Sequence, residues 1–65
     1  MEDTRISVPE CSALTGISVE TLRYWRAVDE GPASFKLGRR VFYRRSEVER
    51  WVEAQEKATL RGGVA

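Results

Sequence analysis

Apolar residues recur three or four positions apart in three stretches of this chain, which is the spacing of one face of an α-helix. They are Val8, Cys11 and Leu14 in the first stretch, Leu22, Trp25 and Val28 in the second, and Val48, Trp51 and Val52 in the third. Three short helices are therefore predicted, each with one face against a shared core. Within that core, Trp51 is expected to pack against Trp25 or Leu22.

Polar residues predict where each helix begins. Ser7 and Glu10 match a capping box, in which the serine hydroxyl and the glutamate carboxylate each accept a hydrogen bond from a backbone amide of the first turn. Ser46 and Glu49 match a second capping box at the start of the third stretch. Ser18 is the expected N-cap of the helix between them.

A short turn connects the first two predicted helices. Gly16 can adopt the positive φ that ends a helix, and Ile17 is apolar enough to fill the corner. Two short helices joined by a glycine turn of this length form a helix-turn-helix. Gly31 and Pro32 should end the second helix, because proline cannot continue it.

A hairpin is predicted after that helix. Strand-forming residues occupy positions 35–37 and 40–43, and Gly38-Arg39 between them allows a tight turn. The strand register stays open, because Val41-Phe42-Tyr43 is a continuous apolar run that does not alternate.

The predicted fold class is therefore mostly α with a small β-hairpin: a winged helix-turn-helix with about three helices and a two-stranded wing. We expect one such domain over residues 1–57, which begins with a loose or briefly extended lead-in over residues 1–5. Residues 58–65 are expected to form a flexible tail.

Length and composition narrow the function. The 65 residues are enough for one small domain with a thin core. One cysteine and no histidine leave no disulfide framework, no zinc site of the usual spacing and no histidine base, so no enzyme activity, metal or cofactor is expected. Because no apolar run approaches 18 residues and no secretory leader is seen, we expect no membrane contact and a cytoplasmic location.

The net charge of +1 conceals a strong asymmetry. Residues 23–45 carry six arginines and one lysine against two acids, a net charge of +5. The segments before and after them are net negative. Arginine predominates in the basic segment, and its planar guanidinium suits phosphate oxygens and guanine edges.

The second predicted helix carries polar residues on the side away from its apolar face. Glu20, Arg23 and Arg26 lie on this side, and Thr21 and Tyr24 lie at its edges. These five are the candidate DNA-reading residues of the helix. Early residues of the second helix of a helix-turn-helix contact base edges in the major groove. Arg23 is a better candidate for reading bases than Tyr24, which is expected to bond a phosphate. The alternative is an ordinary solvated face, on which Glu20 gains mainly from the helix dipole and Tyr24 simply packs.

The predicted hairpin and the residues after it carry further cations. They are Lys36, Arg39, Arg40, Arg44 and Arg45, with Gly38 at the turn. A basic hairpin tip fits a minor groove, especially where A·T tracts narrow the groove and deepen its negative potential. Arg44 and Arg45 precede a helix N-terminus, so a clamp on the DNA backbone is predicted there. The alternative is a hairpin turn with solubilising charges.

Taken in order, these residues resemble a known family. The motifs are Ser7-Val8-Pro9-Glu10-Cys11-Ser12-Ala13-Leu14-Thr15-Gly16-Ile17-Ser18, Thr21-Leu22-Arg23-Tyr24-Trp25, Gly31-Pro32, Lys36-Leu37-Gly38-Arg39-Arg40-Val41 and Ser46-Glu47-Val48-Glu49-Arg50-Trp51. They are similar to the phage excisionase family and its AlpA-like and MerR-like relatives over about residues 6–52. The resemblance implies a second helix in a major groove and a wing in the neighbouring minor groove. A MerR-type regulator continues into a long dimerising helix, which is not expected here.

The resemblance further implies a sequence-specific double-stranded DNA-binding protein in a bacterial host cell. An excisionase is a recombination directionality factor: it binds attachment sites in cooperative arrays, bends the DNA and directs an integrase to excise a prophage, without cutting DNA itself. We therefore expect an excisionase whose partners are DNA, a phage integrase and head-to-tail copies of the same chain, since one small domain reads only a few base pairs. A small AlpA-like transcriptional regulator is the alternative. A protein-interaction module whose arginines meet an acidic partner is a second one.

Overall fold

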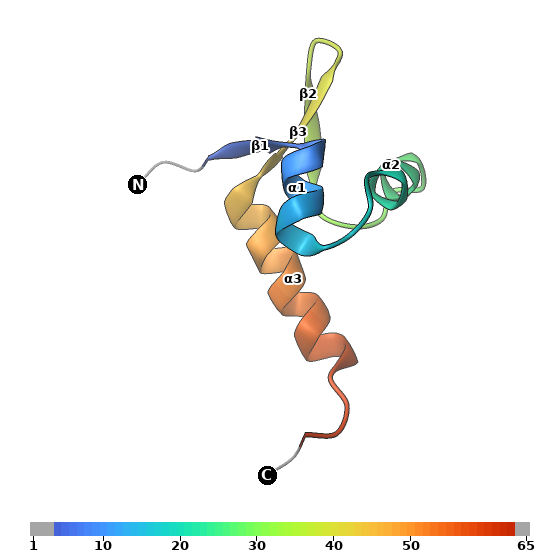
Figure 1. Ribbon diagram of the computed structural model, residues 1–65, viewed down its shortest axis with the longest axis vertical. Coiled ribbons are helices and arrows are strands. Elements are labelled where there is room, and N and C mark those ends of the chain that lie inside the picture. The colour runs from blue at the N-terminus through green and yellow to red at the C-terminus, as the bar shows by residue number, and fades with distance from the viewer. Residues whose placement is uncertain (1–3, 64–65) are drawn as a thin grey trace.

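Three helices and a three-stranded antiparallel sheet make up the fold (Figure 1). The computed structural model describes residues 4–63, so the predicted lead-in and tail lie partly outside the described residues. The elements, in chain order, are β1 (Arg5–Ser7), α1 (Val8–Thr15), α2 (Val19–Ala27), β2 (Ser34–Leu37), β3 (Arg40–Arg44) and α3 (Arg45–Thr59). This architecture confirms the predicted small winged helix-turn-helix. Helix α3 continues to Thr59, two residues past the predicted end of the domain.

Strand β1 is an element that the sequence pattern did not predict. It pairs antiparallel with β3, so that the sheet has the order β1-β3-β2. Ile6 lies opposite Tyr43 in this ladder and is only 7% exposed. Ile6 is therefore a core residue contributed by the sheet. A strand of three residues is too short to show alternation, and its pairing partner lies far along the sequence.

The first helix begins and ends as predicted. Ser7 Oγ accepts a hydrogen bond from the Glu10 amide at 3.3 Å, and Glu10 Oε1 accepts one from the Ser7 amide at 2.8 Å. At the other end Gly16 has φ 80° and its amide donates to the Ser12 carbonyl. This left-handed residue turns the chain toward α2, which completes the helix-turn-helix.

Helix α2 ends earlier than its pattern suggests. Its last helical residue is Ala27, and Asp29 adopts a left-handed φ of 61° before Gly31 is reached. The Glu30 amide then closes the turn on the Trp25 carbonyl at 2.7 Å. Val28 therefore lies at the C-cap and is 44% exposed, so its expected place on the buried face was wrong.

The second capping box is a correction. Helix α3 starts at Arg45 with Arg44 as its N-cap residue, so Ser46 lies inside the first turn. Strand β3 runs into α3 without a loop, and the Arg45 amide donates to the Thr4 carbonyl at 2.8 Å. Glu49, expected to complete the box, instead forms an ion pair with Arg45 at 3.0 Å between Oε2 and Nε.

The core lies where α1, α2, α3 and the sheet meet. Its buried side chains are Ile6, Cys11, Leu22, Tyr43 and Val48, and Val8, Ile17, Trp25 and Val52 pack against them. The predicted tryptophan contact is confirmed, because the Trp25 and Trp51 ring centroids lie 5.6 Å apart. Leu14 is 43% exposed, contrary to its predicted inward place, because its side of α1 faces a hollow beside α3.

The β2–β3 hairpin extends beyond the helices at one end of the molecule, and α3 runs toward the other end (Figure 1). Leu37 pairs with Arg40, so Gly38 and Arg39 form a two-residue loop in which Gly38 has φ 63°. The register that the sequence left open is resolved by Tyr43, which is buried, whereas Phe42 lies on the opposite face of β3.

Candidate nucleic-acid interface

Two contacts fix the orientation of α2 and leave its opposite side facing solvent. Leu22 is 1% exposed in the core and Trp25 packs on Trp51. The residues between them, Arg23 and Tyr24, are consequently exposed, Tyr24 at 64%. Such a helix presents a polar surface to a partner without disturbing its own packing.

The start of α2 is tightly organised by its cap. Ser18 Oγ accepts a hydrogen bond from the Thr21 amide at 3.2 Å and donates one to Thr21 Oγ1 at 2.9 Å. Thr21 is therefore half-buried and its hydroxyl is already engaged, whereas Glu20 beside it is exposed. Of the two, Glu20 is the residue whose side chain is available to a partner.

Arginines from α2 and from the hairpin converge on one surface, which we call the basic hollow. This hollow of about 330 Å³ is lined by Ser7, Val8, Pro9, Arg23, Arg26, Arg39, Arg40 and Val41. Two of its arginines come from the predicted reading helix and two from the predicted wing. The structure therefore brings the two predicted probes together, on either side of the first turn of α1.

The remaining predicted residues lie outside the basic hollow. Arg44 stacks over the Phe35 ring at 5.3 Å on the other face of the sheet. Arg45 pairs with Glu49 on α3, and both side chains are more than half exposed. Lys36 is exposed on β2, and its Cα partner is Val41. The predicted clamp at 44–45 is thus divided, with one arginine on the sheet and one on the helix.

Sequence reasoning missed the contribution of the chain before α1. Ser7 lines the basic hollow, and Arg5 stacks over Phe42 with its guanidinium carbon 5.0 Å from the ring centroid. The polar-apolar-polar order of Arg5, Ile6 and Ser7 fits a strand, but three residues are too few to predict one without knowledge of their pairing with β3.

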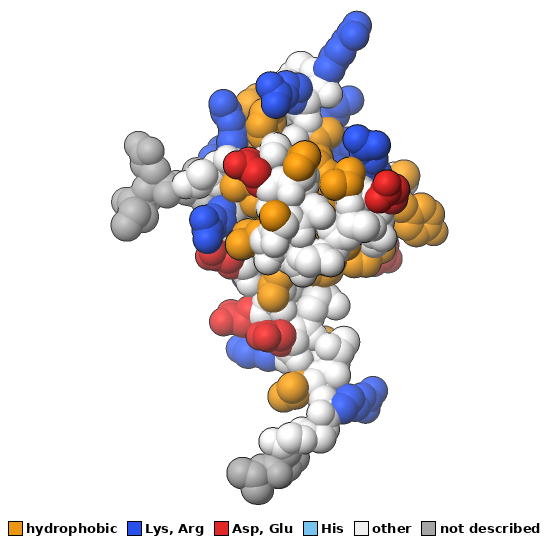
Figure 2. All heavy atoms as spheres, viewed as in Figure 1, with side chains coloured by type: hydrophobic (Ala, Val, Ile, Leu, Met, Phe, Trp, Pro, Cys, Tyr) orange, Lys and Arg blue, Asp and Glu red, His pale blue; other side chains and the backbone are white. Residues whose placement is uncertain are grey.

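Charge is divided along the length of the molecule. On the face drawn in Figure 2, lysine and arginine side chains gather around the hairpin, whereas acidic side chains gather along α3. The acids of α3 are Glu47, Glu49, Glu53 and Glu56. A polyanion approaching this molecule is therefore attracted to the hairpin end and repelled from the side of α3.

Three titratable groups among the described residues have displaced pKa values, and burial accounts for the raised pKa of Tyr43 in the core. Burial raises the pKa of the Cys11 thiol, which keeps it protonated and unreactive in the core. The backbone amide of Ser7, and then its hydroxyl, lower the pKa of the Glu10 carboxyl by hydrogen bonding. Within residues 4–63 no three potential metal ligands of the Cys, Asp or Glu type gather in one place, and no helix there is long and apolar enough to span a bilayer.

Residues 6–56 match the sequence model of a family described as a helix-turn-helix domain. No curated protein and no solved structure matches the chain. The matched range runs from β1 through the two helices and the hairpin into α3, so it includes every element that lines the basic hollow. Because this range is most of the 65 residues, the chain belongs to this helix-turn-helix domain family and is a DNA-binding protein.

Proposed function

We propose that the protein recognises a specific duplex sequence, with the outer side of α2 in a major groove and the β2–β3 hairpin in the adjoining minor groove. The observation that supports this most is the basic hollow, which is lined by arginines from both elements. In B-DNA a phosphate backbone separates the two grooves. A backbone segment lying in the basic hollow therefore contacts α2 and the hairpin at once.

Within this arrangement, Arg23 is the residue we assign to base reading. It is exposed in the second turn of α2, and its guanidinium matches the O6 and N7 atoms of guanine. Glu20 lies one turn earlier on the same side, where its carboxylate accepts a hydrogen bond from a cytosine amine or holds Arg23 in place. Arg39 and Arg40 contact the DNA backbone, so they add affinity without reading sequence.

A salt titration tests the DNA-binding arrangement. Duplexes selected from a randomised library are compared with unselected ones by fluorescence anisotropy at several salt concentrations. About five phosphate contacts give a log-log slope of affinity against salt of about −4 to −5. Arg23→Ala is expected to cost about 1–3 kcal/mol on the selected duplex and little on unselected DNA. A flat salt response refutes the proposal, and equal losses on both duplexes refute the role of Arg23.

We further propose that the protein acts as an excisionase: several copies bind side by side at an attachment site, bend the DNA and direct an integrase to excise a prophage. The small size of the domain supports the need for several copies, because one reading helix and one hairpin contact only a few base pairs. The excision role itself follows from the family resemblance described above.

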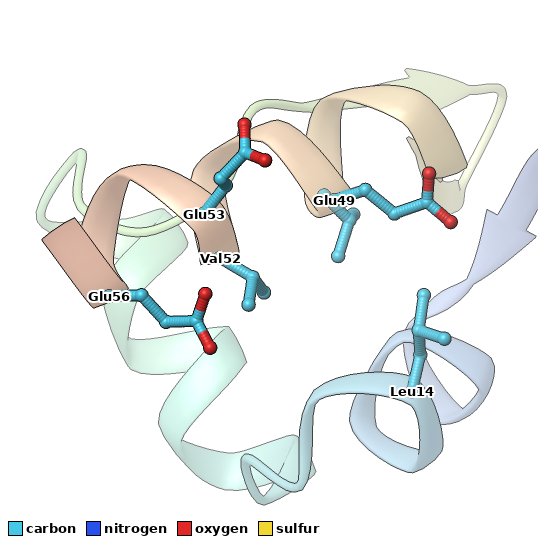
Figure 3. Close-up of a pocket in the computed structure, with 6 residues that line it drawn as sticks. Leu14, Glu49, Val52, Glu53 and Glu56 are labelled. Carbon is cyan, nitrogen blue, oxygen red and sulfur yellow. The ribbon is translucent and has the colours of Figure 1, made fainter.

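An acidic hollow beside α3 supports contacts to other protein molecules. It encloses about 290 Å³ and is lined by Leu14, Val48, Glu49, Val52, Glu53 and Glu56. Figure 3 shows Leu14 of α1 across the space from Val52 and the glutamates of α3. An apolar floor with an acidic rim suits an apolar side chain flanked by cations. The arginine-rich part of a neighbouring copy of this chain, residues 23–45, offers such a segment.

Two assays test these protein contacts and the excision role. Glu53→Gln with Glu56→Gln should lower the cooperativity of binding to DNA with adjacent sites and leave the affinity for a single site unchanged. In a cell carrying an integrase and a prophage flanked by its attachment sites, the wild-type protein should raise the yield of excised circles. Repression of a reporter without any excision would instead identify a transcriptional regulator.

A further inference from the structure

The β2–β3 hairpin carries an exposed leucine near its tip. Leu37, the last residue of β2, is 46% exposed. The exposed large apolar side chains of the described residues are Leu14, Tyr24, Val28, Leu37 and Leu60. Only Leu37 among them belongs to the sheet. A single exposed leucine is ordinary on a protein surface. What distinguishes Leu37 is the set of charges around it and its place on the proposed minor-groove probe.

The side chains around Leu37 are cationic. Lys36 precedes it, Arg40 is its cross-strand partner, and Arg39 lies in the two-residue loop. All three cations are exposed, and no aspartate or glutamate lies between residues 31 and 46. Arg39 and Arg40 also line the basic hollow, in which the proposed DNA backbone lies. The cations that attract a polyanion to the hairpin therefore also bring Leu37 against it.

The hairpin holds Leu37 on a rigid support that extends beyond the helices (Figure 1). The register places Leu37 on the face of the sheet opposite to the buried Tyr43. On that face the rings of Phe35 and Phe42 pack together with centroids 6.1 Å apart. The Arg40 guanidinium carbon lies 5.6 Å from the Phe42 centroid, so this side chain runs back along β3, away from the tip. Leu37 is left as the outermost apolar side chain of this face.

A leucine in a minor groove finds no favourable contact at the base edges. These edges present the N3 atom of adenine and the O2 atom of thymine, which are hydrogen-bond acceptors. Leu37 cannot donate to them, so covering them would remove water without replacing its hydrogen bonds. The apolar surface of DNA is the flat face of each base pair, which becomes accessible when two neighbouring pairs unstack. Apolar side chains inserted at such a step kink the duplex.

We propose that Leu37 inserts between two neighbouring base pairs from the minor groove and kinks the DNA toward the major groove. This inference rests on the proposed placement of the hairpin in the minor groove. Wedges of this kind bend a duplex by about 20–90°. The opened step lies about half a helical turn, or about five base pairs, from the bases that α2 reads.

The wedge also adds a sequence preference at a position where the protein makes no hydrogen bond to a base. Pyrimidine–purine steps unstack most easily, so the deformation is least costly there. Of these steps, TA has no guanine amino group in the minor groove for the leucine to cover. Duplexes selected by the protein should therefore share a TA step at a fixed distance from the bases that Arg23 reads.

The test uses a selected duplex with one binding site, a donor and acceptor dye at its ends, and 2-aminopurine in place of adenine at successive positions. The fluorescence of 2-aminopurine rises when the base unstacks. The wild type should raise it at one step and bring the two ends closer together. Leu37→Ala should lose both changes and keep the salt slope, because every charge remains. Leu37→Met retains a wedge and should retain both changes. Leu60→Ala removes an exposed leucine elsewhere and should behave as the wild type.

A second measurement places a mismatch at the opened step. A mismatch lowers the cost of unstacking, so it should raise the affinity of the wild type several-fold and leave that of Leu37→Ala unchanged. Circular dichroism establishes that the variants are folded.

Three outcomes overturn the inference: the wild type leaves every step stacked, Leu37→Ala still opens the step, or the defect of Leu37→Ala is seen only on DNA that holds two or more copies. The last outcome would assign Leu37 to a contact between protein molecules. A steep salt slope in the wild type without unstacking refutes this inference alone. A flat salt slope refutes the proposed function as well.

Discussion

Replacing Gly31 by alanine should destabilise the domain far more than the same change at Gly16, although both residues have nearly the same backbone conformation. Gly16 has φ 80° and Gly31 has φ 77°. In this left-handed region an L-residue costs about 1–2 kcal/mol. Loss of glycine also restricts the unfolded chain, which offsets about 0.4–1 kcal/mol. These two effects are common to both positions, so they cancel in the comparison.

The two glycines differ in what surrounds them. A Cβ at Gly16 meets no atom within 4 Å, whereas a Cβ at Gly31 would lie 2.6 Å from Cε3 of Trp25. Carbon atoms normally approach to about 3.5–4.0 Å, so the indole must move by about 1 Å. Overpacking of this kind costs about 1–3 kcal/mol. The displaced ring is the one that packs on Trp51, so the position of α2 changes with it.

Thermal unfolding measures this difference directly. Gly31→Ala should have a Tm below that of Gly16→Ala by about 4–8 °C for each kcal/mol of the difference in a domain of this size. Tryptophan fluorescence of the folded state should change in Gly31→Ala and not in Gly16→Ala. Equal Tm values for the two variants would show that Trp25 yields without cost, and the reasoning from the close approach would then be wrong.

Three further predictions concern the cap, the core and the wing. Glu10→Gln should make the free energy of unfolding less sensitive to acid. Hydrogen bonds from Ser7 lower the pKa of the Glu10 carboxyl below 4.5, so the stability contributed by the Glu10 carboxylate is complete above that pH and is lost as the pH falls through the folded pKa. Urea unfolding of both proteins from pH 6 to pH 3 measures this difference. Leu22→Ala, at a site only 1% exposed, should cost about 2–5 kcal/mol and leave a domain of this size largely unfolded by circular dichroism at 37 °C. Arg39→Ala with Arg40→Ala should weaken binding to selected and unselected duplexes alike and reduce the salt slope by about 1.8. A loss confined to the selected duplex would assign these arginines to base reading instead.

The local signals in the sequence were reliable where no distant segment competed with them. Ser7 and Ser46 stand in the same capping-box pattern, yet only Ser7 caps a helix. The difference is that the amide of Arg45 bonds to Thr4, so the helix starts one residue before Ser46. That contact joins residues 41 positions apart in the sequence, and no local pattern could have revealed it.

The candidate interface was likewise predictable in composition but not in geometry. The arginines of α2 and the hairpin were identifiable from helix-turn-helix order and turn chemistry. Successive side chains of a strand point to opposite faces, so the face that each arginine occupies depends on the register of β3. The continuous apolar run from Val41 to Tyr43 gave no sign of which face is buried. The structure shows that Arg40 and Arg44 stack on phenylalanines behind the hairpin, and that Arg5 joins them through the unpredicted strand β1.

The direct junction between β3 and α3 limits how this fold can change in length. No residue separates Arg44 from Arg45, so an insertion there would detach the hairpin from the last helix and break the bond from Arg45 to Thr4. At the hairpin tip, in contrast, each pair of added residues lengthens the reach of the wing by about 3.3 Å and leaves the existing strand pairs of the sheet in place. Natural variation in length, and any engineered tag or fused domain, should therefore be tolerated at Gly38-Arg39 and after Thr59 and rejected at the junction.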